Sequence, residues 1–196
     1  MNPAIASPAN QLKSQLRRQL LKQRQSLPPT TWREKSDRLC QRLRSLSLVE
    51  NAQTILAYFS IRQEPDIQPL LIEPNLALRR WGFSRCVGTS LIWHSWTPDA
   101  PLITGRYGIP EPAADAVILE PADVDLILIP AVAGDSRGYR LGYGAGFYDR
   151  LLSLPDWSAI PTIGILFDFA YLPELPTDPW DQKLSAICTE TRTVLY

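Results

Sequence analysis

Apolar side chains recur with two different periods along this chain, and the period changes near residue 50. Before that point Leu12, Leu16 and Leu20 stand four residues apart with cations between them, which predicts a helix over residues 11–26. The stretch from Thr31 to Glu34 has the residue types of a capping box and predicts the start of a second helix. The apolar face of that second helix would contain Trp32, Leu39, Leu43 and Leu46.

Beyond residue 50 the apolar residues form short runs of strand length at 54–59, 91–96, 125–130 and 162–166, with a last strand at 186–187 and 193–196. The run 125–130 is apolar throughout, which is typical of a strand buried on both faces of a parallel sheet. Helices are predicted from near Gln68 and over 147–154. Strands that alternate with helices predict a Rossmann-like α/β fold of three α/β/α layers around a mainly parallel central sheet.

Length and composition add limits to this picture. A chain of 196 residues suits one domain, so we expect a flexible N-terminal tail over residues 1–10 and a single domain over 11–196. Twenty basic and twenty acidic residues give a formal net charge of zero, which argues against a nucleic-acid partner. No apolar run is long enough to suggest a membrane segment. We expect a cytoplasmic monomer.

The cysteines and the histidine exclude several kinds of site. Cys40, Cys86 and Cys188 are scattered and form no CxxC pair, so neither a disulfide framework nor a zinc site is expected. The single histidine, His94, lies in a strand-like run and is expected to be a structural or surface residue. A Ser-His-Asp triad or a two-histidine metal site is therefore excluded, and the chemistry must depend on carboxylates, Lys and Arg, backbone N–H groups or a hard metal ion.

One segment carries most of the candidate chemistry. Between the run that ends at Pro130 and the helix predicted over 147–154 lies Arg140-Leu-Gly142-Tyr-Gly144-Ala-Gly146-Phe-Tyr148-Asp149-Arg150. Glycines at every second position let the backbone bring its N–H groups close to a bound anion, and a following helix N-terminus would add partial positive charge. We therefore predict a phosphate site with a carboxylate beside it for a metal. The spacing matches neither the dinucleotide fingerprint nor the Walker loop.

Other charged residues have simpler interpretations as well. Lys13 and Arg17 lie one turn apart and could form the solvated face of an amphipathic helix. The simpler role for Asp149 is to stabilise the first turn of a helix, for Glu64 to belong to a polar turn, and for Asp181 to be an N-cap. Because the turn at Glu64 and the glycine segment each follow a predicted strand, they could also meet in one cleft at the carboxyl edge of the sheet.

These segments together resemble the 5-formyltetrahydrofolate cyclo-ligase family. Its hallmark RLGYGGGYYDR is similar to the segment from Arg140 to Arg150, and its N-terminal KxxLR is similar to Lys13-Ser-Gln-Leu-Arg17. Tyr58-Phe59-Ser60 followed by Glu64-Pro-Asp66 resembles the family's strand and acidic turn. The family's (F/W)(G/N)IPxP element and its C-terminal D-x-K turn resemble Tyr107-Gly-Ile-Pro-Glu-Pro112 and Asp178-Pro-Trp-Asp181-Gln-Lys183. The matches occur in the right order over nearly the whole chain.

The resemblance implies an enzyme that uses ATP and Mg²⁺ to convert 5-formyltetrahydrofolate to 5,10-methenyltetrahydrofolate. The formyl oxygen would be phosphorylated and nitrogen-10 would close the ring, releasing ADP and phosphate. By position, ATP would be held by Lys13, Arg17, Arg140, Leu141, Gly142, Tyr143, Gly144, Ala145, Gly146, Phe147 and Tyr148. The folate would contact Phe59, Glu64, Tyr107, Tyr143, Gly144, Ala145, Gly146 and Phe147. Mg²⁺ would be held by Asp149 and Asp181, and the catalytic residues would be Arg140 and Tyr143.

The chain departs from the family pattern at two positions of the glycine segment. Ala145 replaces a glycine or lysine, which removes any charge at that point, and Phe147 replaces a tyrosine, which removes a hydroxyl group. Two other functions also fit the residues. One is a nicotinamide-dependent oxidoreductase with Asp168 as the ribose ligand, and the other is a non-catalytic module that binds folate or nucleotide.

Overall fold

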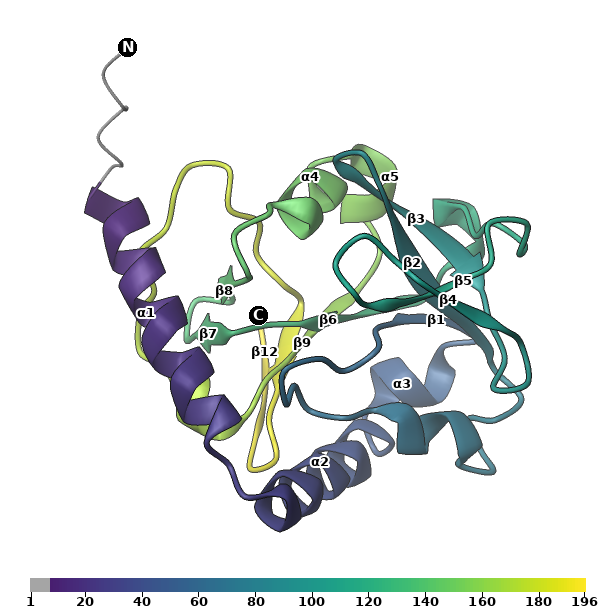
Figure 1. Ribbon diagram of the computed structural model, residues 1–196, viewed down its shortest axis with the longest axis horizontal. Helices are drawn as coiled ribbons and strands as arrows, with labels where there is room; N and C mark the ends of the chain where they lie inside the picture. The colour runs from purple at the N-terminus through teal and green to yellow at the C-terminus, as the bar shows by residue number, and fades with distance from the viewer. Residues whose placement is uncertain (1–7) are drawn as a thin grey trace.

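The computed structural model describes residues 8–196, and Figure 1 shows its ribbon. Residues 1–7 lie outside the described part of the chain, and with them most of the tail expected over residues 1–10. The first helix, α1 (Pro8–Gln25), begins at Pro8 rather than at residue 11, so residues 8–10 form its first turn.

The core of the described residues is a seven-stranded sheet in the order β12-β11-β9-β6-β1-β2-β3. The strands from β11 to β2 in this order are parallel to their neighbours, whereas β12 and β3 pair antiparallel at the two edges. This confirms the predicted mainly parallel sheet. The strands are β1 (Thr54–Ala57), β2 (Arg80–Val87), β3 (Ser90–Ser95), β6 (Leu126–Pro130), β9 (Thr162–Ile165), β11 (Ala186–Cys188) and β12 (Thr193–Leu195).

Helices cover both faces of this sheet, which gives the three layers seen in Figure 1. The central strand β6 shows why, because Leu126 and Leu128 pack into one apolar cluster while Ile127 and Ile129 pack into the other. The first cluster is covered by α2 (Pro29–Leu43), α3 (Ser47–Asn51) and the 3₁₀ helix η1 (Gln68–Ile72). The second is covered by α1, α4 (Phe147–Leu152) and α5 (Pro155–Ser158).

Several local expectations differ from the structure. The helix α2 begins at Pro29 after Pro28, and no side chain caps it, so the predicted capping box at Thr31 does not form. The strand β2 was not predicted, because its residues show neither a continuous apolar run nor a strict alternation of polar and apolar types. Leu12, expected on the apolar face of α1, is 52% exposed, and the buried positions of that helix include Lys13, Leu20 and Arg24.

Two small sheets flank the main one. One consists of β4 (Leu102–Thr104) and β5 (Pro110–Pro112), and the other of β10 (Tyr171–Leu172), β7 (Ala133–Asp135) and β8 (Arg140–Leu141). Short 3₁₀ turns lie at η2 (Pro121–Asp123) and η3 (Asp168–Ala170). Because β7 follows β6 closely and β8 pairs with β7, the chain returns Arg140 to the carboxyl end of the main sheet.

The order of the parallel strands places a ligand site. From β1 the chain goes to β2 on one side and later to β6 on the other side of β1, so the topology switches between β1 and β6. Open α/β sheets bind ligands at the carboxyl ends of strands beside such a switch. Tyr58 and Phe59 follow β1 directly and Pro130 ends β6, and all three line a cavity there.

His94 and two of the cysteines, Cys40 and Cys188, are buried in the core. His94 lies on β3, is 3% exposed, and its Nδ1 lies 2.8 Å from the carbonyl oxygen of Ala116. The three cysteines are free. Burial raises the pKa of the Cys40 thiol to about 12 and that of Cys188 to about 11, which keeps both thiols protonated. Among residues 8–196 no helix is both long and apolar enough to cross a membrane.

Candidate active site

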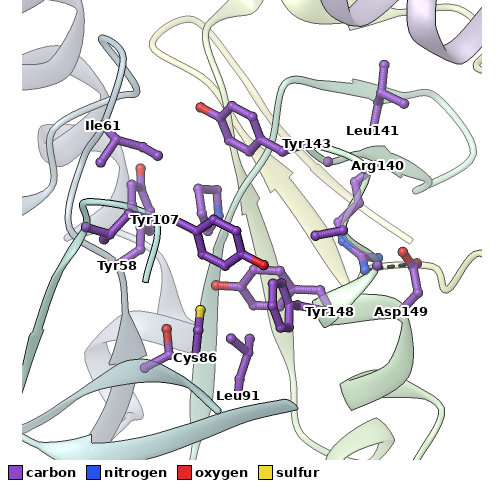
Figure 2. A pocket seen from close by; sticks show the side chains of 18 of the residues that line it. Tyr58, Ile61, Cys86, Leu91, Tyr107, Arg140, Leu141, Tyr143, Tyr148 and Asp149 are labelled. Carbon is purple, nitrogen blue, oxygen red and sulfur yellow. Dashed lines mark hydrogen bonds and ion pairs between the residues drawn. The ribbon is translucent and has the colours of Figure 1, made fainter. Parts of the chain in front are cut away.

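A cavity of about 670 Å³ opens at the switch point. Figure 2 shows Arg140 and Asp149 joined at one side of it, Tyr58 and Ile61 at the other, and the ring of Tyr107 between them. Every site residue expected from the sequence lines this cavity, namely Lys13, Arg17, Phe59, Glu64, Tyr107, Arg140, Leu141, Gly142, Tyr143, Gly144, Ala145, Gly146, Phe147, Tyr148, Asp149 and Asp181. The fold therefore brings together segments that are far apart in the sequence.

The helix α1 places two cations at this cavity, although such charges usually face solvent. Lys13 is 6% exposed, and its Nζ donates a hydrogen bond of 2.7 Å to Asp178 Oδ2 and another to Asp181 Oδ2. Burial alone would lower the pKa of Lys13, but the hydrogen bonds and charges of the two carboxylates outweigh it and raise the pKa. Arg17 Nε donates to the carbonyl oxygen of Gly142 at 2.7 Å. The simple interpretation of a solvated face is therefore wrong for Lys13.

The glycine segment lines the cavity and has unpaired backbone amides among the described residues. Within residues 8–196 none of the backbone N–H groups of residues 142–146 donates a hydrogen bond. Gly144 has φ +101°, a conformation that other L-residues rarely adopt, and a Cβ there would lie 3.5 Å from Cζ of Arg17. The segment can therefore satisfy these donors with water or with an anion.

The expected contribution of the helix dipole is smaller than the sequence suggested. The helix α4, which follows the glycine segment, spans only six residues, Phe147–Leu152. A macrodipole is the sum over aligned peptide units, so a helix this short adds little positive potential. Attraction for an anion must come chiefly from the amides and from Lys13, Arg17 and Arg140.

Arg140 is the most deeply placed cation of the glycine segment. Its side chain is 4% exposed, Nη2 donates to Asp149 Oδ1 at 2.9 Å, and Nη1 donates to the carbonyl oxygen of Gln182 at 2.9 Å. Burial lowers the pKa of this guanidinium from its ordinary value against the opposing charge of Asp149. Arginine nevertheless stays protonated in proteins, so a fixed positive charge faces the cavity.

Two carboxylates, Asp149 and Asp181, could hold a metal ion here. The Oδ1 atom of Asp149 accepts hydrogen bonds from Arg140 and from the N–H of Gln182, and Oδ2 of Asp181 accepts from Lys13 and the N–H of Asp178. The other oxygen of each accepts no hydrogen bond from residues 8–196. Within that range no group of three His, Cys, Asp or Glu is arranged to hold a metal. This donor set fits Mg²⁺, which is usually bound by one or two carboxylates with phosphate and water.

The opposite end of the cavity contains a buried carboxylate. Glu64 is 2% exposed, its Oε1 accepts a hydrogen bond of 2.8 Å from the Tyr143 hydroxyl, and its Oε2 accepts one of 3.1 Å from the N–H of Ile61. Burial raises the pKa of Glu64, and the charge of Arg24 is the largest opposing influence. The glycine segment thus reaches both ends of the cavity, with its amides at the cationic end and Tyr143 at Glu64.

Aromatic rings line the cavity between its two ends. Tyr107 is 52% exposed and meets the ring of Phe147 edge-on, with centroids 6.0 Å apart. Phe59 is buried and stacks on Phe83 with centroids 4.2 Å apart. Burial raises the pKa of the Tyr148 hydroxyl well above its ordinary value, which keeps it protonated. A flat ring system could lie between the exposed ring of Tyr107 and the cavity wall.

Sequence reasoning missed two charged residues of this region. Asp178 shares Lys13 with Asp181 and lines the cavity. Arg24 donates a hydrogen bond to the Tyr143 hydroxyl and lies 3.9 Å from Oε1 of Glu64. The signal for Arg24 was its spacing, because residues 11 positions apart on a helix return to nearly the same face as Lys13.

The ribose role considered for Asp168 finds no support in its surroundings. Asp168 is not among the residues that line the cavity. Its carboxylate accepts hydrogen bonds from Arg192 Nε at 2.7 Å and from the Thr189 hydroxyl at 3.0 Å, which tie η3 to the hairpin of β11 and β12. This is a structural arrangement.

Comparison with known proteins gives a consistent result. A sequence model of the 5-formyltetrahydrofolate cyclo-ligase family matches residues 9–190. The chain is 30% identical over 178 residues to a 5-formyltetrahydrofolate cyclo-ligase of Escherichia coli, covering 86% of this chain and 95% of that protein. It is 31% identical over 191 residues to that of Mycolicibacterium smegmatis, covering 93% and 96%.

Solved structures agree. The structure of Aquifex aeolicus 5,10-methenyltetrahydrofolate synthetase superposes with a TM-score of 0.83 at 32% identity, covering 94% of this chain and 92% of that one. The synthetase of Mycoplasma pneumoniae superposes with a TM-score of 0.71 at 26% identity, covering 91% and 98%.

Proposed function

Because the chain belongs to the 5-formyltetrahydrofolate cyclo-ligase family and has its cyclo-ligase activity, we propose that it uses ATP with Mg²⁺ to drive ring closure. The oxygen of the N5-formyl group attacks the γ-phosphorus of ATP and ADP leaves. Nitrogen-10 then attacks the formyl carbon and loses its proton, and phosphate departs with the original formyl oxygen. The products are 5,10-methenyltetrahydrofolate, ADP and phosphate.

One observation carries this proposal. A single cavity has cations and free amides at one end and a buried carboxylate among aromatic rings at the other. Phosphoryl transfer needs mainly positioning and neutralisation of charge, and the cationic end supplies both without a histidine. The acidic end suits a pterin, whose neighbouring N–H groups can donate together to one carboxylate.

We assign the ATP phosphates to Lys13, Arg17 and the segment from Arg140 to Tyr148. The free amides of residues 142–146 would donate to phosphate oxygens, and Arg140 would neutralise the charge that develops on the transferred group. Among residues 8–196 Arg17 donates only through Nε, to the carbonyl oxygen of Gly142, so its two Nη atoms are available. Asp149 and Asp181 would hold Mg²⁺, which would neutralise phosphate charge when bound.

The folate is assigned to the other end. Glu64 would accept the pterin N–H edge, and Tyr107 and Phe147 would contact its ring, with Phe59 behind them. The Tyr143 hydroxyl donates a hydrogen bond to Glu64, and Tyr143 belongs to the glycine segment that would bind the phosphates. The catalytic role we propose for it is to fix the position of the folate relative to these phosphates. Ala145 adds no charge and Phe147 no hydroxyl to this segment, and Arg140 is the cation of the segment that pairs with Asp149.

The test is a coupled assay on the whole chain. ATP consumption is measured with and without 5-formyltetrahydrofolate while the methenyl product is followed by its near-ultraviolet absorbance. We expect one ADP for each methenyl group formed and little ATP hydrolysis without folate. Binding of both ligands without turnover would instead support the non-catalytic module, and ATP hydrolysis that ignores folate would refute the proposal.

The metal assignment gives a separate prediction. Asp149→Asn keeps the acceptor for Arg140 but removes the charge, so the Mg²⁺ concentration for half-maximal rate should rise about tenfold or more. Asp115→Asn, at an exposed carboxylate outside the cavity, is the matched control and should leave the titration unchanged. An identical metal titration for Asp149→Asn and wild type would remove Asp149 from the metal site.

A further inference from the structure

Arg24 is a buried arginine near the C-terminal end of α1, and it has no part in the proposed binding of ATP, Mg²⁺ or folate. Its side chain is 4% exposed, Nε donates to the carbonyl oxygen of Arg62 at 3.1 Å, and Nη2 donates to the Tyr143 hydroxyl. The remaining atom, Nη1, is buried and has no hydrogen-bond partner within the described residues. An unpaired buried donor is costly, so packing alone does not account for an arginine at this position.

The spacing along α1 relates Arg24 to the rest of the site. Lys13, Arg17 and Arg24 project within about 40° of one another around the helix, and Arg24 lies about 16 Å along the axis from Lys13. One face of the helix therefore runs from the phosphate end of the cavity, where Lys13 meets Asp178 and Asp181, to the end that contains Glu64.

The turn that carries Glu64 has an unusual backbone. Arg62 and Gln63 have φ of 48° and 55°, which non-glycine residues rarely adopt in succession. The surrounding contacts hold this conformation. Arg24 Nε donates to the carbonyl oxygen of Arg62, and the side-chain Nε2 of Gln63 donates to the carbonyl oxygen of Leu27 at 3.2 Å. The indole of Trp32 donates to the carbonyl of Glu64 at 2.8 Å. Backbone strain maintained in this way is typical of functional sites.

Arg24 also faces the charge of Glu64 directly. The groups around this carboxylate are the guanidiniums of Arg24 and Arg62 and the hydroxyls of Tyr58, Tyr143 and Tyr148. The tyrosines stay neutral, so the cost of burying an ionised Glu64 is offset by the charges of the two arginines and by the hydrogen bonds from the N–H of Ile61 and the Tyr143 hydroxyl. Because Tyr143 donates its proton to Glu64, it can only accept from Arg24, which fixes the direction of the chain of hydrogen bonds.

We propose that Arg24 is a positioning residue that keeps Glu64 ionised and holds Tyr143 against it, so that the carboxylate is ready for the N–H edge of the pterin. The inference rests on the proposed folate role of Glu64. It assigns to α1 a function at both ends of the cavity, phosphate binding through Lys13 and Arg17 and preparation of the folate end through Arg24.

The test compares Arg24→Met with wild type by measuring equilibrium binding of 5-formyltetrahydrofolate and kcat/KM for folate against pH. Without the guanidinium the pKa of Glu64 should rise further, so the acid limb of both profiles should move to higher pH. We expect folate binding near neutral pH to weaken about tenfold or more, whereas the KM for ATP should change less than about threefold. Arg24→Lys keeps the positive charge, so its acid limb should lie close to that of the wild type.

Two further variants separate positioning from a structural role. In a Glu64→Gln background Arg24→Met should have almost no additional effect on folate binding, because the group on which it acts has lost its charge. Arg18→Met, at an exposed position of α1, should leave the profiles unchanged. Urea unfolding checks that each variant is folded, and Arg24→Lys serves for the comparison if the methionine variant is not.

An unmoved acid limb in a folded Arg24 variant, or equal losses for ATP and folate, would overturn the inference. Full additivity of the Arg24 and Glu64 substitutions would do the same. These outcomes are distinct from failure of the proposed function, which would appear in the wild-type enzyme as ATP hydrolysis independent of folate.

Discussion

Arg140→Ala is expected to reduce kcat/KM for ATP by about 10³-fold, the largest effect of any single substitution considered for this chain. The reason is that its buried guanidinium provides a fixed charge at the phosphate end, and no side chain of the remaining glycine segment up to Phe147 is a cation. Lys13 and Arg17 remain, so some ATP binding should persist. Initial rates with each substrate varied in turn measure the effect.

The structure also indicates how this result could mislead. Arg140 ties Asp149 to the loop at Gln182, so its loss could loosen the cavity as a whole. Arg140→Lys keeps the positive charge but lacks the planar guanidinium with its several donors. Its loss of kcat/KM for ATP should be intermediate between those of wild type and Arg140→Ala. Arg150→Ala, at the exposed end of the same segment, should behave nearly as wild type. Equal losses for ATP and folate in Arg140→Ala would point to misfolding rather than to a phosphate role.

Glu64→Gln should reduce kcat/KM for folate by about 10²-fold and leave the KM for ATP almost unchanged, because hydrogen bonds to a charged acceptor are the stronger ones. Glu190→Gln is a matched control, since Glu190 is also a buried glutamate but lies outside the cavity, where it pairs with Lys35. It should leave folate kinetics close to wild type. A folate KM that is unaltered in Glu64→Gln would exclude Glu64 from the site.

Glu64→Gln, which should impair folate use, should also make the folded protein more stable relative to wild type as pH rises. Burial raises the pKa of Glu64 in the folded state above its ordinary value, so stability present at low pH is lost as pH rises through the folded pKa. Glutamine does not ionise and escapes this loss. The free energy of unfolding of Glu64→Gln relative to wild type should therefore increase between about pH 4 and pH 8, measured by urea denaturation. A constant difference would mean that Glu64 has the same pKa in the folded and unfolded states.

The elements that the sequence predicted correctly are those in which local pattern and burial agree. The run 125–130 is apolar throughout because β6 is covered on both faces, so composition alone identifies it. The strand β2 pairs with β1 but carries Arg80, Ser84 and Arg85, because its two ends leave the covered part of the sheet. Strands of two or three residues such as β8 are too short to show any period.

The site residues were predicted through motif resemblance, and the limits of that prediction are physical. Glu64 and Tyr143 are 79 residues apart, and only the return of the chain through β7 and β8 brings them within a hydrogen bond. Arg24 belongs to no motif and is one of 20 Lys and Arg residues, half of which are exposed. Its burial depends on where α1 docks, which no local pattern reveals.

The pairing of opposite charges at the phosphate end has a consequence for how a nucleotide enters. Lys13 is already engaged by Asp178 and Asp181, and Arg140 by Asp149. A nucleotide stripped of its metal would draw these cations away and leave carboxylates facing one another, while a metal ion alone would displace the cations without giving them a new partner. In the proposed site only ATP that arrives already complexed with Mg²⁺ would give every displaced charge a new partner, so uncomplexed ATP should be a weak competitor of MgATP.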